Sequence, residues 1–162
     1  SWMVMPYNYE ESGTSASYTM ERMPMTDIAI RWTNNAIDIE RYSYTAQSRD
    51  IIRKQLKLEN NTAICAVARF VESKQHSFLI DIFKEYLKYD SKAKLALIGS
   101  GELEDVIKTK VNDVHINDSV IFLGARSDVA ELLGAMDCFV LPSLFEGFPL
   151  TAVEYALIIC PF

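Results

Sequence analysis

The sequence lacks several features that would point to a membrane, a nucleic acid or a metal ion. No apolar run approaches the ~18–20 residues that cross a bilayer, and no signal-peptide pattern opens the chain. Acidic residues outnumber basic ones by 22 to 16, which gives a net charge of −6 and argues against a nucleic-acid partner. There is no Asp-x-Asp, and no group of His, Cys and carboxylate residues has metal-ligand spacing. We therefore expect a cytoplasmic protein that uses neither a metal nor another cofactor.

Cysteine and histidine are also scarce. The three cysteines, Cys65, Cys138 and Cys160, lie in apolar segments without CxxC spacing, which predicts buried thiols in a reducing compartment. Of the two histidines, His76 is expected to face solvent or to cap a helix start, and His115 to lie at the end of a helix. Neither histidine has an obvious nucleophile to serve.

The chain changes character near residue 26. Residues 1–26 hold five of the six methionines but show no helical or strand period, and we interpret them as a loosely structured lead-in to which we assign no function. From residue 27 to 162, short apolar segments alternate with amphipathic ones, and the composition of 49% hydrophobic and 23% charged residues is that of a globular protein. The predicted strands are residues 27–33, 62–68, 93–99, 119–124 and 137–143, and the predicted helices are 48–58, 75–89, 103–114, 129–136 and 150–159.

This alternation predicts βαβ units and a Rossmann-like α/β fold, in which a parallel sheet has helices on both faces. Ser48 is the expected N-cap of helix 48–58, and either Ser127 or Asp128 that of helix 129–136. In helix 75–89, the period of 3.6 residues places one apolar stripe at Leu79, Ile82, Phe83, Tyr86 and Leu87.

Parallel sheets of this kind bind ligands beyond the carboxyl ends of their strands, so the loops after residues 68, 98, 123 and 143 form the candidate site. Arg69 and Lys74 follow the first of these ends, where two cations beside a helix N-terminus suit a diphosphate; the alternative is that both are solvated surface charges. Gly99 and Gly101 permit a tight turn after the next strand. After the following strand, Arg126 either flanks a base or faces water.

The last loop carries two glutamates eight residues apart. In the stretch FVLPSLFEGFPLTAVEYA, residues 139–156, Glu146 precedes the predicted helix and Glu154 lies one turn inside it. If the helix begins near Leu150, N–H groups around Thr151 are available to an anion. Carboxylates repel a diphosphate and are better suited to accept hydrogen bonds from ribose or hexose hydroxyls. The alternative is a helix-terminal acid at Glu154 and a surface residue at Glu146, without a ligand.

Taken together, these residues resemble a known family. The segments NNAIDIERY, VARFVESKQHSFLIDIF, KLALIGSGELEDVIKTK and VIFLGARSDVAELLGAMDCFVLPSLFEGFPLTAVE are similar, in order and spacing, to the C-terminal half of group 1 bacterial glycosyltransferases. The resemblance covers roughly residues 30–156 and is strongest to retaining enzymes of the GT-B architecture that build capsular and exopolysaccharides. It implies a donor-binding domain for a nucleotide sugar, in an enzyme that transfers a hexose to a saccharide or lipid-linked acceptor without a bound metal.

The resemblance also implies roles for single residues. Arg69 and Lys74 would bind the donor diphosphate and stabilise it as it leaves. Glu146 and Glu154 would form the E-x7-E element of the family, with Glu146 near the reacting carbon of the sugar and Glu154 on the ribose hydroxyls. The other implied donor-binding residues are Gly99, then Gly124 and Arg126 beside the nucleobase, and Phe148, Leu150 and Thr151 beside the sugar and phosphate.

Several positions depart from the family. Ala36 and Ala68 stand where glycine is usual, Tyr155 follows the second glutamate where small residues are usual, and Ile159 replaces a glycine. The last strand and helices of such a domain and the N-terminal acceptor-binding domain are missing, so we expect a fragment that is inactive alone. Alternatives are a truncated, non-catalytic binding or interaction module and another GT-B reaction such as sugar epimerisation. The exposed edge of an incomplete sheet predicts self-association, and peripheral membrane association is expected only of the full enzyme.

Overall fold

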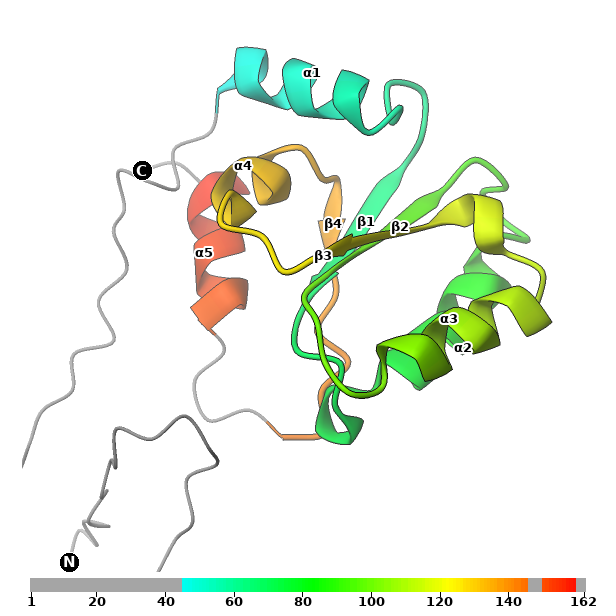
Figure 1. Cartoon of the computed structure of the whole chain (residues 1–162). Coiled ribbons are helices and arrows are strands. Elements are labelled where there is room, and N and C mark those ends of the chain that lie inside the picture. The colour runs from blue at the N-terminus through cyan, green and yellow to red at the C-terminus, as the bar shows by residue number, and fades with distance from the viewer. Residues whose placement is uncertain (1–44, 146–149, 160–162) are drawn as a thin grey trace, which may run out of the picture. The chain divides into compact units, whose positions relative to one another are not determined.

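The computed structural model describes residues 45–145 and 150–159, which form a sheet of four parallel strands in the order β3-β2-β1-β4 (Figure 1). The predicted strand 27–33 and the predicted domain boundary at residue 26 lie outside the described residues. In chain order the elements are α1 (Ala46–Gln55), β1 (Ala63–Val67), the 3₁₀ turn η2 (Glu72–Lys74), α2 (His76–Tyr86), β2 (Lys94–Ile98), α3 (Glu104–Asp113), the 3₁₀ turn η3 (Asn117–Ser119), β3 (Val120–Gly124), α4 (Val129–Gly134), β4 (Cys138–Phe139) and α5 (Leu150–Ile159).

Helices cover both faces of this sheet, as the sequence predicts. One face carries α2 and α3, whose Leu79, Phe83 and Ile107 join Ala66 of β1 and Leu97 of β2 in one buried cluster. The other face carries α1, α4 and α5 (Figure 1). Alternate residues of a strand point to opposite faces, so strands covered on both sides are continuously apolar. The buried cluster of the second face consists of Leu58, Ala63, Cys65, Ala96, Leu133, Ala135, Met136 and Ile158.

The chain reverses its direction across the sheet between β3 and β4. β1, β2 and β3 lie side by side in chain order, whereas β4 pairs with the other side of β1. Because crossovers between parallel strands are right-handed, this reversal moves the connecting helix from the α2 and α3 face to the opposite one. Such a switch point, at the carboxyl ends of β1 and β4, is where open α/β sheets bind ligands. The topology therefore brings the loop after β1 and the loop after β4 to one place.

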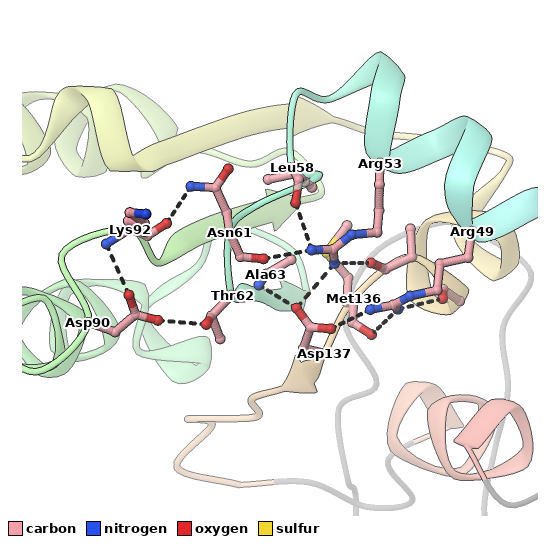
Figure 2. A network of polar contacts seen from close by, with 12 residues as sticks. Arg49, Arg53, Leu58, Asn61, Thr62, Ala63, Asp90, Lys92, Met136 and Asp137 are labelled. Carbon is pink, nitrogen blue, oxygen red and sulfur yellow. Dashed lines mark hydrogen bonds and ion pairs between the residues drawn. The ribbon is translucent and has the colours of Figure 1, made fainter. Parts of the chain in front are cut away.

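At the opposite, amino-end edge of the sheet, two arginines fasten α1 to the strands (Figure 2). Arg49 is paired with Asp137 and donates to the Met136 carbonyl oxygen at 2.9 Å. Arg53 donates to Asp137 Oδ2 at 3.1 Å, and the same oxygen accepts the N–H of Ala63, the first residue of β1, at 2.7 Å. Partial burial by itself raises the pKa of Asp137, but these hydrogen bonds outweigh it and hold the pKa below its usual value. Asp137 thereby joins α1 to the start of β1.

β4 is much shorter than the predicted strand 137–143. Its ladder with β1 contains only Cys138 and Phe139, followed by one further hydrogen bond at 2.8 Å from the Val140 N–H to the Cys65 carbonyl oxygen. Pro142 has no N–H with which to extend this ladder. Because β4 ends at Phe139, the chain leaves the sheet early and continues toward η2. This path brings the loop after β4 to the candidate site.

The cysteines divide into a buried and an exposed thiol. Cys65, in the central strand β1, is buried as predicted, and burial raises the pKa of its thiol to about 12. Cys138 is exposed, contrary to the prediction, because β4 is an edge strand of the described sheet. Cys160 lies outside the described residues.

The start of α1 also differs from the prediction. Thr45 rather than Ser48 is its N-cap, because the helix begins at Ala46 and Ser48 lies inside the first turn. The Thr45 Oγ1 accepts the Ser48 N–H at 3.1 Å, which satisfies one of the N–H groups that a helix start leaves unpaired.

The predicted apolar stripe of α2 is confirmed at Leu79 and Phe83, which are buried, and at Leu87, which packs against the same cluster, but not at its other two residues. Ile82 and Tyr86 are 45% and 37% exposed. His76, predicted at the surface or as a cap, is only 4% exposed, because it begins the helix beside Phe70 and its ring stacks on that side chain. Residues three or four apart share a helix face, so the core-facing side chains are His76, Leu79, Ile80 and Phe83.

Candidate functional site

The loop after β1 is tied to the loop after β2 by backbone hydrogen bonds. The Ala68 N–H donates to the Ile98 carbonyl oxygen at 3.0 Å, and the Phe70 N–H donates to the Ser100 carbonyl oxygen at 3.1 Å. The Leu103 N–H in turn donates to the Phe70 carbonyl oxygen at 3.0 Å. The residues on both sides of Arg69 are therefore held in place.

Two glycines allow these loops to come so close. A Cβ atom on Gly99, whose φ is +140°, would lie 2.0 Å from the Ala68 carbonyl oxygen. A Cβ atom on Gly101 would lie 2.6 to 2.9 Å from three backbone atoms of Phe70. Gly99 and Gly101 thus let the loop after β2 come close to the loop that carries Arg69.

Aromatic rings also support the loop after β1. Phe70 is 1% exposed and stacks on His76, with ring centroids 4.3 Å apart and an interplanar angle of 15°. The ring centroid of Phe122, in β3, lies 6.1 Å from that of Phe70, and the planes of the two rings differ by 28°. Burial, and to a smaller degree the charge of Lys74, lowers the pKa of His76, which favours the neutral imidazole. Sequence analysis did not single out Phe70 or this role of His76.

Arg69 and Lys74 lie on the loop that leaves β1. Arg69 is exposed, and its guanidinium forms no hydrogen bond or ion pair with the residues that the structure describes. Lys74 is half-buried at the end of η2, directly before α2. Leu144, in the loop after β4, donates its N–H to the Ser73 carbonyl oxygen at 2.9 Å. The loops after β1 and β4 therefore touch beside Lys74, as the switch-point topology requires.

α5 supplies the other predicted residues. Leu150 and Thr151 are its first two residues, and Glu154 lies one turn later and is half-buried. The ring of Tyr155 packs 5.6 Å from that of Phe139, at the end of β4, so the bulky residue after Glu154 contributes to the core. Glu146 and Phe148 lie outside the described residues, so one glutamate of the pair has a described position.

The loop after β3 is held by its own ion pair. Gly124 has a φ of +67°, a conformation that favours glycine, and its carbonyl oxygen accepts the Gly99 N–H at 2.8 Å. Arg126 donates from Nε to Asp128 Oδ1 at 2.7 Å, and this hydrogen bond raises the pKa of Arg126 and lowers that of Asp128. Asp128 occupies the N-cap position of α4, but its carboxylate binds Arg126 and does not cap the helix. Ser127, the other predicted cap, precedes that position.

A depression with a volume of about 330 Å³ lies beside these loops, between the starts of α2 and α3. None of the predicted site residues with a described position lines it. The predicted residues are thus brought to one edge of the sheet by the loops and do not share this depression. Its lining consists of Val71, Glu72, Gln75, His76, Ser77, Phe78, Asp81, Leu103, Val106 and Ile107.

Two further observations concern residues 45–145 and 150–159. No three His, Cys, Asp or Glu side chains of these ranges come together as a set of metal ligands. In the same ranges, no helix combines the length and the apolar character needed to cross a bilayer.

The chain belongs to the group 1 glycosyltransferases, because the family described as "Glycosyl transferases group 1" matches residues 47–161. Among curated relatives, EpsF of Bacillus subtilis, named "Putative glycosyltransferase EpsF", is 32% identical over 121 residues, which are 74% of this chain and 32% of that protein. The UDP-Gal:alpha-D-GlcNAc-diphosphoundecaprenol alpha-1,3-galactosyltransferase of Escherichia coli is 29% identical over 124 residues, 74% of this chain and 32% of that protein. The chain spans about a third of the length of these relatives.

Solved structures confirm the predicted α/β fold as that of GT-B glycosyltransferases. Anabaena Alr3699/HepE in complex with UDP-glucose has a TM-score of 0.70 and 26% identity, over 76% of this chain and 35% of that one. The C-terminal domain of the group 1 glycosyltransferase LpcC from Francisella tularensis has a TM-score of 0.65 and 21% identity, over 77% of this chain and 68% of that one. The second match bears on the fold alone.

Proposed function

We propose that this chain is the nucleotide-sugar-binding half of a retaining glycosyltransferase. The observation that carries the proposal is the place of Arg69: an exposed guanidinium without a partner among the described residues, held at the switch point of the sheet beside Lys74. An anionic ligand would give the Arg69 guanidinium a partner, since Arg and a carboxylate or phosphate form strong, charge-assisted hydrogen bonds. The match to a structure that contains UDP-glucose supports a uridine diphosphate sugar as that ligand.

The proposed chemistry follows from the charges of the site. Arg69 and Lys74 bind the two phosphates and stabilise the negative charge that develops on the leaving diphosphate, so that no metal ion is required. Glu154 lies one turn into α5, where it accepts hydrogen bonds from the ribose hydroxyls. Glu146 completes the E-x7-E pair and contacts the transferred sugar.

The remaining contacts of the donor are arranged around this centre. Backbone groups of Leu150 and Thr151 bind the sugar and the phosphate, because the first turn of a helix has N–H groups to donate. Phe148 is a further proposed contact of the donor. Gly124 and Arg126 border the uracil. Gly99 contributes through the loop that carries Arg69, because it lets the loop after β2 approach that loop closely.

We propose a lipid-linked saccharide as the acceptor, bound by a separate acceptor-binding domain. The relative from E. coli is named for a diphosphoundecaprenol-linked acceptor, and so is a Campylobacter jejuni relative, an N-acetylgalactosaminyltransferase that is 29% identical over 109 residues. Another relative, from Salmonella typhi, is named as a protein of Vi polysaccharide biosynthesis. These names support a role in building polysaccharides on lipid-linked acceptors.

Isothermal titration tests the donor site on the 162-residue chain, with UDP, UDP-glucose, GDP and inorganic pyrophosphate as ligands. We expect UDP and UDP-glucose to bind. Arg69→Ala should weaken both UDP and pyrophosphate, since it removes a phosphate contact, whereas Glu154→Ala should weaken UDP and leave pyrophosphate unchanged. Glu131→Ala, at an exposed position of α4, is the matched control for loss of a carboxylate. A folded chain that binds none of the nucleotides would contradict the proposal.

A further inference from the structure

Support for the loop after β1 converges on Phe70, the residue next to Arg69. The Phe70 backbone is hydrogen-bonded on both sides, to Ser100 and to Leu103, and its ring is stacked on His76. Arg69 itself contributes nothing to this packing and its side chain is exposed. The backbone direction from which the guanidinium extends is therefore set by its neighbour.

The support of the loop after β1 depends on the absence of a side chain at Gly101. Gly101 has no positive φ, unlike Gly99 and Gly124, so its backbone conformation is open to other residues. A Cβ atom at Gly101 would nevertheless meet the N, C and O atoms of Phe70 at 2.6 to 2.9 Å. Backbone atoms cannot rotate away as a side chain can, so the loop that carries Arg69 must shift if Gly101 gains a Cβ atom.

We propose that Gly101, acting through Phe70, is a positioning residue for the Arg69 guanidinium. This inference rests on the proposed role of Arg69 in binding the donor diphosphate. His76 extends the effect to Lys74, because it follows η2 by two residues and its ring supports that of Phe70. Donor affinity then depends on the contact between Gly101 and the Phe70 backbone.

A double-mutant cycle tests the inference, with UDP affinity measured by titration and folding checked by circular dichroism and urea unfolding. Gly101→Ala should weaken UDP binding on the order of tenfold in the wild-type background. In the Arg69→Ala background the same change should alter the affinity by less than about twofold, because the group that it displaces is already absent. Gly134→Ala is the matched control, since its Cβ would meet only the Ile158 Cγ2 atom, at 3.9 Å, and should leave UDP affinity unchanged.

The results separate this inference from the proposed function. If Arg69→Ala leaves UDP affinity unchanged, the donor role of Arg69 is wrong and the positioning role falls with it. If Arg69→Ala weakens binding but folded Gly101→Ala does not, or weakens it equally in both backgrounds, only the positioning role is overturned.

A second pair of variants applies even if Gly101→Ala does not fold. His76→Phe keeps a ring against Phe70, whereas His76→Ala removes it. We expect His76→Phe to bind UDP as the wild type does and His76→Ala to bind several-fold more weakly, with that loss absent in the Arg69→Ala background. Equal UDP affinities for the two His76 variants would overturn the positioning role.

Discussion

The two edges of the sheet both carry arginines, but they use them in opposite ways. At the amino-end edge, Arg53 donates to the Leu58 and Asn61 carbonyl oxygens at 2.6 Å, in addition to the Ala135 carbonyl oxygen and Asp137 (Figure 2). Its side chain is only 11% exposed. At the carboxyl-end edge, Arg69 is exposed and has no partner among the described residues.

This difference indicates what each arginine is for. A guanidinium has five N–H donors in a fixed plane. Those of Arg53 form hydrogen bonds with carbonyl oxygens at the end of α4 and in the turn before β1. Such a residue joins segments of the chain that are far apart in sequence. A guanidinium that the fold holds by its backbone alone keeps its donors for a ligand, which is the role that we propose for Arg69.

The largest expected effect is on stability, from Arg53→Met at the amino-end edge. The change leaves Asp137 and several carbonyl oxygens with fewer partners in a partly buried place, so the free energy of unfolding should fall by about 2–4 kcal/mol. UDP affinity should stay within about twofold, because the site lies at the other edge of the sheet. Urea unfolding and titration with UDP measure the two quantities.

Lys88→Met is the control for this variant. Lys88 pairs with Glu85, but both side chains are more than 60% exposed, at 64% and 63%, so no measurable loss of stability is expected. The contrast between the two edges breaks if Arg53→Met unfolds at the same urea concentration as Lys88→Met.

The opposite pattern of effects is expected from Arg69→Ala, at the carboxyl-end edge of the sheet. Its free energy of unfolding without ligand should differ from that of the wild type by less than about 0.5 kcal/mol, since no described contact is lost. A ligand that binds the folded state stabilises it by about 2.7 kcal/mol at 100 times its Kd. UDP should therefore raise the urea midpoint of the wild-type chain and raise that of Arg69→Ala much less. A clear destabilisation of Arg69→Ala in the absence of UDP would assign it a structural role.

A smaller effect is expected in acid, through Asp137. Its pKa in the folded chain lies below that of an unfolded Asp, about 3.9, so the network adds stability above that pH. The contribution is lost as the pH falls through the folded-state pKa. The difference in unfolding free energy between the wild type and Asp137→Asn should thus be constant near neutral pH and shrink below about pH 4. A difference that does not change with acid would show that the charge of Asp137 is not what holds the network.

Much of the fold could be predicted from the sequence, because apolar periodicity is a local signal. The strands at 63–67, 94–98 and 120–124 lie within the predicted ranges, and α5 spans the predicted residues 150–159. What periodicity cannot supply is the surroundings of a residue. Cys138 lies in an apolar run yet is exposed on an edge strand, and the Arg49, Arg53 and Asp137 network joins residues more than 80 positions apart.

The candidate site divides in the same manner. Arg69 and Lys74 could be placed after the carboxyl end of a predicted strand because the alternation of strands and helices is a local signal. The strand order, which brings their loop against the loop after β4, does not follow from that alternation. The contact between Gly101 and Phe70, and the stacking of Phe70 on His76, depend on how two loops approach in space. A sequence with glycine at 99 and 101 is equally compatible with a turn that faces a ligand.

The smallest expected effect concerns Arg126, which lies at the carboxyl-end edge of the sheet but has a partner, Asp128. Its pair with Asp128 is exposed and joins residues only two apart, so Arg126→Ala should not measurably change the urea midpoint. Because Arg126 would leave that pair only for a ligand that compensates it, UDP affinity should fall by a few-fold at most, less than for Arg69→Ala. Titration of the two variants with UDP and with pyrophosphate makes the comparison. If Arg126→Ala weakens UDP as strongly as Arg69→Ala does, then a partner within the fold does not mark an arginine as structural, and the contrast between the two edges loses its predictive value.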